Sequence, residues 1–301
     1  MGLLIKAEFR KIVTTKMWWA LLVPSILLAI GWAWLGGAFF SDVADGVSDA
    51  LDSVNANIDL GEMSWASLAL TRAMNFATLF PMTFGALAVA SEISRRTITT
   101  SFLTAPTRAS VLTAKAIVYV GWGLIYGVVV AIGATIGTAI GSDAEVLPDT
   151  GDWILILLSG VLACLLWTLL GMGVGALLGS PVAALLVLLL YAGLVGPVSE
   201  LILTGATEGS HLAGFMPNGS ANGLTGATAS ELLYQQAQDM VAASGNSFIP
   251  DDAIDGFNDA VRFAAGAPGA FAMWISGLIF AGWTALFFVT GMIRNNNRDI
   301  T

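Results

Sequence analysis

Six long apolar runs constrain the fold of this sequence more than any other feature. A helix needs about 20 apolar residues to cross the hydrocarbon core of a bilayer, and the first run, residues 17–40, contains no charged residue. Its length also exceeds the roughly 7–15 apolar residues of a cleaved signal peptide. Soluble domains carry about 25% charged residues, whereas this chain carries 11%. The sequence therefore predicts an all-α polytopic membrane protein with six transmembrane helices: residues 17–40, 66–90, 111–140, 153–178, 182–203 and 269–293.

The basic residues are distributed unevenly between the segments that join these runs. Six spans place both termini on one side, together with one long connection: residues 1–16, 91–115 and 294–301. This side holds ten of the 12 Lys and Arg, and the opposite side holds only Arg72 and Arg262. Because Lys and Arg are enriched in cytoplasmic loops, we expect both termini and residues 91–110 to be cytoplasmic. Residues 204–268 form the largest segment on the external side.

The N-terminal residues 1–16 have the pattern of an amphipathic helix in the membrane interface. The apolar residues fall on one stripe at three- and four-residue spacing: Ile5, Phe9, Ile12 and Val13. Lys6 and Arg10 lie beside this stripe, where they can meet anionic headgroups. Glu8 and Lys11 are expected to lie away from it. The alternative is a basic terminus that only determines topology.

Proline and glycine positions predict where the spans bend and where they pack. Pro81 lies within the second span and Pro197 near the outer end of the fifth, and a proline inside a helix kinks it. Small residues at four-residue spacing allow close helix–helix approach, and this chain has such glycines at Gly123, Gly127, Gly133, Gly137, Gly171 and Gly175. Arg72 lies near the outer end of the second span, where its long side chain can reach water. The external segment is predicted to hold short helices near residues 229–243 and 251–265.

The motifs of most catalytic and metal sites are missing. None of the four lysines follows a glycine, so the sequence has no P-loop for nucleotide phosphates. One Cys and one His, Cys164 and His211, exclude a disulfide framework and a His/Cys metal cluster within this sequence. Ionisable residues are absent from the central turns of the apolar runs, which disfavours an ion-coupled carrier and an intramembrane enzyme. We therefore expect no catalytic site, metal or cofactor in this chain, and any pump activity would need an ATPase on another polypeptide.

Three sequence elements outside the centres of the apolar runs have recognisable patterns. The N-terminal helix carries Glu8-Phe9-Arg10-Lys11. Between the second and third runs lie Glu92, Arg96-Thr97-Ile98-Thr99, Leu103, Pro106, Arg108, Val111 and Ala114-Lys115. The external segment carries Phe215-Met216-Pro217-Asn218-Gly219-Ser220-Ala221-Asn222-Gly223-Leu224-Thr225. Together these elements resemble the permeases of ABC-2-type transporters, and the external one resembles a motif of actinobacterial members. Family members often have Arg two residues after the Glu and Gly before the Thr, where this chain has Ser94 and Arg96.

The resemblance implies a division of the chain and a role for its basic side. Residues 1–16 would be a cytoplasmic elbow helix, with Lys6, Glu8, Phe9, Arg10 and Lys11. Residues 17–301 would be a six-helix transmembrane domain of the type V exporter kind. A coupling helix within 91–110 would insert into a groove of the ATPase, with these contact residues: Glu92, Ile93, Arg95, Arg96, Thr97, Ile98, Phe102, Leu103, Pro106 and Arg108. The alternative is that these arginines only anchor the loop to lipid headgroups.

The function implied is that of the permease subunit of an ATP-binding cassette exporter for a hydrophobic or amphipathic molecule such as a drug, peptide or lipid. Its partners would be two copies of a separate ATPase, which bind ATP and Mg, a second permease copy, identical or homologous, and membrane lipids. No nucleic-acid partner is expected. The location would be the bacterial plasma membrane, as a multi-pass protein. The alternative is a membrane-anchored sensor or assembly subunit whose external segment binds a partner without transport.

Overall fold

The chain folds into a bundle of long helices with smaller helices at both ends. The computed structural model describes residues 1–53, 63–97, 107–207, 210–244 and 251–296. The α-helices are α1 (Gly2–Thr14), α2 (Met17–Ser53), α3 (Ala66–Ala77), α4 (Leu79–Ser94), α6 (Arg108–Gly141), α7 (Thr150–Leu178), α8 (Pro181–Leu190), α9 (Gly196–Ala206), α10 (Pro217–Ser244), α11 (Asp251–Ala265) and α12 (Met273–Asn296). Short 3-10 helices lie at Ala144–Val146 and Ala213–Phe215, and a π-helical segment at Tyr191–Val195.

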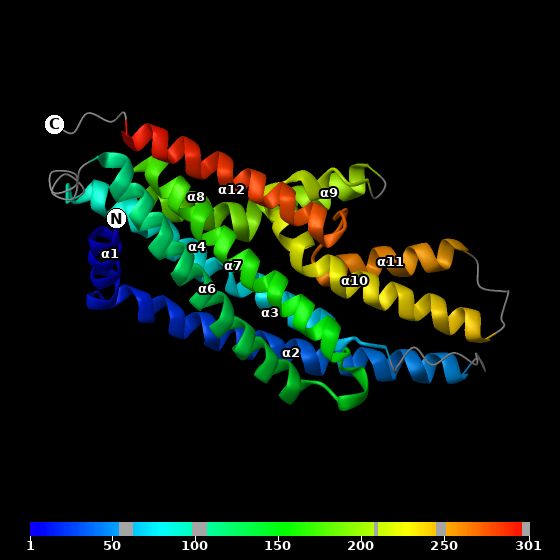
Figure 1. The fold of residues 1–301 in the computed structure, drawn as a ribbon. Coiled ribbons are helices and arrows are strands. Elements are labelled where there is room, and N and C mark those ends of the chain that lie inside the picture. The colour runs from blue at the N-terminus through cyan, green and yellow to red at the C-terminus, as the bar shows by residue number, and fades with distance from the viewer. Residues whose placement is uncertain (54–62, 98–106, 208–209, 245–250, 297–301) are drawn as a thin grey trace.

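Six helical stretches within the described ranges are long and apolar enough to cross a membrane: Met17–Asp49, Ala66–Ser94, Ala109–Gly141, Thr150–Leu178, Pro181–Ala206 and Met273–Asn295. The prediction of an all-α polytopic membrane protein is confirmed. The N-terminus and the end of α12 lie at one end of the bundle, where α1 leads into α2 at a steep angle (Figure 1). We call this end, which also holds residues 91–97, the basic end. The far end of α2 projects with α10 and α11 from the opposite end (Figure 1), which we call the acidic end.

Helix α7 lies at the centre and packs against α4, α6 and α12. Glycines make these contacts close, because a side chain at their positions would collide with a neighbouring backbone. A Cβ at Gly171 would lie 2.1 Å from the carbonyl oxygen of Met82 on α4, and one at Gly137 would lie 2.3 Å from that of Ile30 on α2. The other predicted packing glycines make similar contacts. Gly123 and Gly127 face α7, Gly133 faces α2, and Gly175 faces α4.

The second span is broken at Thr78, which ends α3 and precedes α4. Pro81 has no N–H to donate to the carbonyl of Ala77, four residues earlier. The hydroxyl of Ser25 on α2 donates to this carbonyl instead, over 3.4 Å. The interruption of the helix thus lies three residues before the proline, and the kink itself stays a prediction.

The fifth span keeps its helical path through Pro197 rather than ending there. Pro197 cannot donate to the carbonyl of Gly193, and the preceding segment Tyr191–Val195 is π-helical. Helix α9 then continues to Ala206. A change of helix type therefore precedes Pro197, and the bend expected there stays a prediction.

Several element boundaries differ from the sequence-based ones. The first helix continues past residue 40 to Ser53, because Ala44 on this polar extension is buried in the same cluster as Met63 and Val261. The sixth helix begins at Met273, not at residue 269, because Gly266 and Gly269 have φ of 75° and 65° and form a turn after α11.

The helix expected near residues 229–243 begins much earlier, at Pro217. Its first turns are rich in Gly, Asn and Ser, which have low helix propensity. Close packing outweighs this cost: a Cβ at Gly219 would lie 2.0 Å from the carbonyl oxygen of Ala213, and one at Gly223 would lie 2.6 Å from the hydroxyl of Ser276.

Candidate functional site: a buried charge network at the basic end

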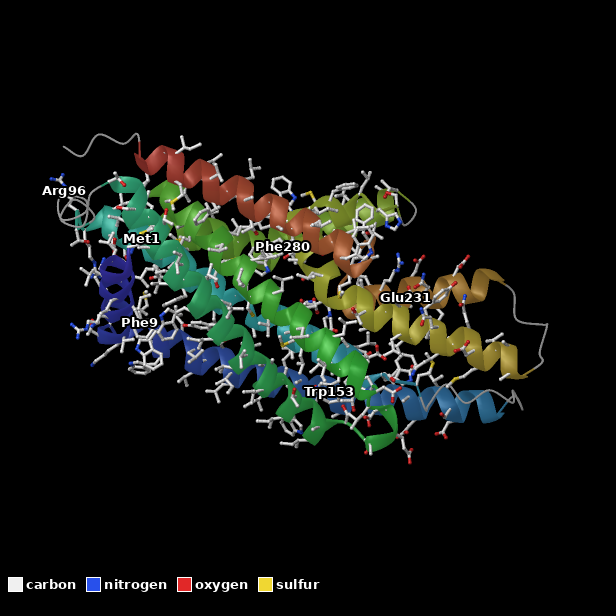
Figure 2. All side chains as sticks on the ribbon, in the orientation of Figure 1. Met1, Phe9, Arg96, Trp153, Glu231 and Phe280 are labelled. Carbon is white, nitrogen blue, oxygen red and sulfur yellow. The ribbon has the colours of Figure 1, made fainter. Side chains whose placement is uncertain are left out.

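The N-terminal helix α1 is held against α6 by aromatic stacking and by a buried charge. The rings of Phe9 and Trp122 stack with their centroids 6.2 Å apart, and Trp18 lies 5.4 Å from the same indole. Figure 2 shows Met1, Phe9 and Arg96 at one end of the molecule, and Glu231 toward the other. Helix α1 is therefore a fixed part of the basic end.

The buried face of α1 is formed by Glu8 and Ile12, with Ile5 half-buried. This corrects the expectation that Glu8 lies away from the packed stripe. Residues 5, 8 and 12 follow one another at three- and four-residue spacing, so a helix that buries the two isoleucines also buries the glutamate between them. Phe9 and Val13, expected on the same stripe, are exposed.

Four charged side chains from α1, α4 and α6 form one network. The ammonium nitrogen of Lys115 lies 2.6 Å from Glu8 Oε2 and 2.9 Å from Glu92 Oε1. The ammonium nitrogen of Lys11 lies 2.8 Å from Glu8 Oε1 and 2.7 Å from Glu92 Oε1. Each cation therefore donates to both carboxylates, and two positive charges balance two negative ones.

Lys115 is the buried centre of this network, since its side chain is 1% exposed. A buried charge is tolerated only when it is paired and hydrogen-bonded. Removing one partner of such a pair costs about 3–5 kcal/mol, because the remaining charge is left uncompensated in a low-dielectric site. The network therefore fixes the relative positions of α1, the end of α4 and the start of α6.

The pKa values of the two groups on α1 reflect this pairing. Burial alone raises the pKa of Glu8, but the positive charges of Lys115 and Lys11 outweigh it and hold that pKa below its ordinary value. Burial alone lowers the pKa of Lys11, but its hydrogen bonds to Glu8 and Glu92 outweigh it and raise that pKa. Both groups are ionised at neutral pH.

The network lies at both ends of segment 91–110. Glu92 is in the last turn of α4, where the chain enters the segment, and Lys115 is in the second turn of α6, where the chain leaves it. A cavity of about 500 Å³ lies beside the network. Its lining includes Glu8, Lys11, Glu92, Arg95, Thr97 and Tyr119.

The end of α4 has the hydrogen bonds of a Schellman motif with an arginine in the position usually held by glycine. The N–H of Thr97 donates to the carbonyl of Glu92 over 3.0 Å, and the N–H of Arg96 donates to that of Ile93 over 3.1 Å. Arg96 has a φ of 57°, the left-handed region that glycine occupies without cost. This residue is the one that departs from the family pattern of Gly before Thr, and the backbone geometry explains why glycine suits the position.

The structure divides the predicted docking residues into different environments. Glu92 is buried within the charge network, so it faces the bundle and not a docking surface. Ile93 is half-buried against the apolar cluster beneath the network, while Arg95, Arg96 and Thr97 are exposed. The remaining members lie outside the described residues (Ile98, Phe102, Leu103 and Pro106), or, for Arg108, have an undescribed side chain at the start of α6.

The predicted elbow residues are likewise split between the surface and the network. Lys6 and Arg10 are exposed, and Lys11 is exposed along its stem while its ammonium group reaches both carboxylates. Sequence reasoning named Glu8, Lys11 and Glu92 separately and did not pair them with Lys115. A signal was available: Lys115 lies within an apolar run, and only three acids, among them Glu8 and Glu92, belong to the basic side.

The bundle and its basic end define a multi-pass helical membrane protein in which an amphipathic N-terminal helix is tied by charge to the connection between the second and third spans. The chain matches the family model described as ABC-2 family transporter protein over residues 3–300, and it belongs to that family. It is therefore an ABC-2 transporter permease, the membrane component of an ABC transporter. A comparison with curated proteins gives no match.

Proposed function

We propose that this permease exports a hydrophobic or amphipathic molecule across the bacterial plasma membrane, driven by a separate ATPase that docks on segment 91–110. Both termini and this segment would lie in the cytoplasm. Two ATPase subunits, binding ATP and Mg, would serve two permease copies, identical or homologous. Ten of the 12 Lys and Arg belong to the basic end, which supports this orientation.

The single observation that carries this proposal is the charge network at both ends of segment 91–110. A force applied to the segment by a docked ATPase reaches α4 through Glu92 and α6 through Lys115, and both residues bind Glu8 of α1 directly or through Lys11. Because paired buried charges resist separation, the three helices would move together. This is the rigid-body behaviour that rocking between inward- and outward-open states requires.

The exposed arginines Arg95 and Arg96 would contact the ATPase. The double variant Arg95→Glu with Arg96→Glu should lose co-purification of the ATPase and uncouple ATP hydrolysis from transport, while membrane insertion is retained. The matched control is Lys16→Glu with Arg294→Glu, which makes the same charge change at exposed positions of the basic end. Unchanged ATPase binding in the first double variant would exclude the docking role.

A sensor or assembly role is the second candidate, and the acidic end favours it. The extension of α2 packs with α10 and α11 around Ala44, Ala237 and Val261, which gives the protein an ordered helical structure beyond the spans. Such a structure could bind an external partner. Stimulation of the partner ATPase by an added substrate distinguishes the two, because only a transport subunit passes substrate binding to the ATPase.

A further inference from the structure

Two adjoining cavities lie near the acidic end, between α3, α4, α9 and the first turns of α10. Their volumes are about 310 Å³ and about 260 Å³. Arg72, Pro197 and Asn222 line both of them. The two cavities are therefore adjacent, and we refer to them together as one space, whose larger part reaches inward to Met82 and Trp167.

The polar wall of this space centres on the buried carboxylate of Glu200, which is 4% exposed. The side-chain amide of Asn218 donates to Glu200 Oε1 over 2.7 Å, and that of Asn222 donates to Oε2 over 3.5 Å. The hydroxyl of Thr225 donates to Asn75 Oδ1. Residues 218, 222 and 225 recur at four- and three-residue spacing, so one face of α10 carries all three side chains.

Arg72 brings a positive charge to the same wall, but its hydrogen bonds go to backbone groups. Its Nε donates to the carbonyl of Ala264 over 2.8 Å and its Nη2 to that of Phe263 over 3.4 Å. These carbonyls belong to the last turn of α11, where carbonyls lack helical N–H partners, and that of Phe263 also accepts from the N–H of Gly266 over 2.9 Å. One cation, Arg72, therefore borders both cavities, and one anion, Glu200, borders the smaller one.

One hydrogen-bond donor at this wall is unused. The side-chain nitrogen of Asn75 is buried and has no hydrogen-bond partner among the described residues. Leaving a buried donor unpaired costs about 1–3 kcal/mol. Asn75 lines the larger part of the cavity, so an acceptor atom placed there would remove this cost.

The opposite wall of the larger cavity is apolar and includes a non-α backbone. Leu79, Met82 and Trp167 line it from α4 and α7, and Ala192 and Gly193 line it from the π-helical segment. Segments of this kind occur frequently at functional sites. The volume of about 310 Å³ is at the small end of the range for ligand pockets.

We propose that this space is a binding site for an uncharged amphipathic molecule, whose head accepts a hydrogen bond from Asn75 and whose apolar part lies against Leu79, Met82 and Trp167. A charged head is disfavoured, because it would lose its hydration on entering the cavity and would meet one charged side chain of each sign nearby, Arg72 and Glu200. If the proposed export function holds, on which this step rests, the site defines the class of substrate.

Chemical protection of a cysteine in the cavity wall tests the site. In a Cys164→Ala background, Ala192→Cys places a thiol in the lining, while Leu194→Cys places one on the outer face of the same π-helical segment, where Leu194 is 55% exposed. The rate of modification by a small neutral methanethiosulfonate is measured on the purified chain with decanamide, decanoate or decylammonium. Decanamide should slow the modification of Ala192→Cys and leave Leu194→Cys unaffected.

Asn75→Ala should weaken protection by decanamide about tenfold, the effect of one lost hydrogen bond at a buried site. Thr225→Val is the control, because it removes the bond to Asn75 Oδ1 and keeps the Asn75 donor. It also reports on misfolding, since it disturbs the same pair of helices.

Several outcomes would overturn the proposal: equal protection of both cysteines, stronger protection by decanoate or decylammonium, or no modification of Ala192→Cys. The measurement needs neither ATPase nor transport. A failure here alongside intact ATPase docking would reject the site alone, whereas loss of docking with intact protection would reject the proposed coupling alone.

Discussion

The two ends of the bundle differ in how they pair their charged side chains. At the basic end, two lysines and two glutamates pair directly with one another over 2.6–2.9 Å, although Glu92 Oε2 has no hydrogen-bond partner among the described residues. At the acidic end, Glu200 and Arg72 each bind other partners, and Asn75 keeps an unused donor beside a cavity. Direct ion pairs tie three helices together at the basic end, whereas the unused amide donor at the acidic end borders a space that a ligand could fill. The comparison thus separates a structural role from a binding role.

Matched replacement of the buried cation at each end should give the largest difference. Lys115→Met leaves Glu8 and Glu92 without their buried partner and should reduce the free energy of unfolding by about 3–5 kcal/mol. Arg72→Met removes hydrogen bonds to two carbonyls but leaves Glu200 bonded to both asparagines, so the loss should be about 1–3 kcal/mol. Denaturant unfolding in one detergent measures both.

Rescue by neutralising the partners is the control for this comparison. The triple variant Glu8→Gln, Glu92→Gln, Lys115→Met should recover most of the stability lost in Lys115→Met, because it removes the uncompensated charges. A loss in Lys115→Met no larger than in Arg72→Met would contradict the view that the basic end is the structural one.

Acid should weaken the basic end through Glu8. The pKa of Glu8 is lowered from its ordinary 4.5 by Lys115 and Lys11, against the effect of burial. The charge of Glu8 therefore contributes fully to stability at pH values above its ordinary pKa. This contribution is lost as the pH falls through the lower pKa of the folded state, because the unfolded chain binds the proton at a higher pH than the folded chain does. Glu8→Gln should be less stable at neutral pH and lose this part of the acid dependence.

The thermal midpoint measured from neutral pH to about pH 3 follows this effect. Asp45→Asn is a control, since Asp45 is an exposed carboxylate on the extension of α2. An acid profile of Glu8→Gln identical to that of the unaltered chain would show that Glu8 contributes nothing through its charge.

The smallest expected effect concerns the end of α4. Arg96→Gly should stabilise the protein by about 1 kcal/mol, because Arg96 has a φ of 57° and glycine occupies that region without cost. The neighbouring Arg95→Gly should be destabilising by about 0.5–1 kcal/mol, because Arg95 has a φ of −87° that favours a side chain. The thermal midpoints of the two variants should move in opposite directions, and a shift of both in one direction would contradict the assignment of strain to Arg96.

The spans could be predicted from the sequence because each depends on its own residues. Length, hydropathy and charge are properties of a continuous run, and so are the effects of Pro81 on α4 and of glycine spacing on α6 and α7. The length of α10 could not be predicted in this way, since its Gly-rich start is helical only through contact with Ala213 and Ser276. Packing from elsewhere outweighed local propensity.

Both polar clusters depend on contacts between distant segments. Asn75 and Thr225, for example, are 150 residues apart in the sequence. Arg72 is expected near the outer end of the second span, and Glu200 follows Pro197 near the outer end of the fifth. These positions put the two residues at similar depth but do not predict that they line the same cavity. From the sequence, the motif that begins at Phe215 indicated only a family resemblance. The spacing of Asn218, Asn222 and Thr225 is explained by the fold, which places Glu200 and Asn75 beside the face of α10 that carries these three side chains.

The charge network also has a consequence for biogenesis. Glu8 and Lys115 are 107 residues apart, and the buried partner of both carboxylates is a lysine that follows two complete spans. During synthesis, α1, α2, α3 and α4 emerge before this lysine is available, and only Lys11 can then pair with Glu8 and Glu92. The two carboxylates must therefore stay hydrated until the third span is inserted, because two negative charges with a single cation are costly to bury. A nascent chain stalled before Lys115 would hold α1 loosely, and insertion of the third span would be the event that completes the basic end.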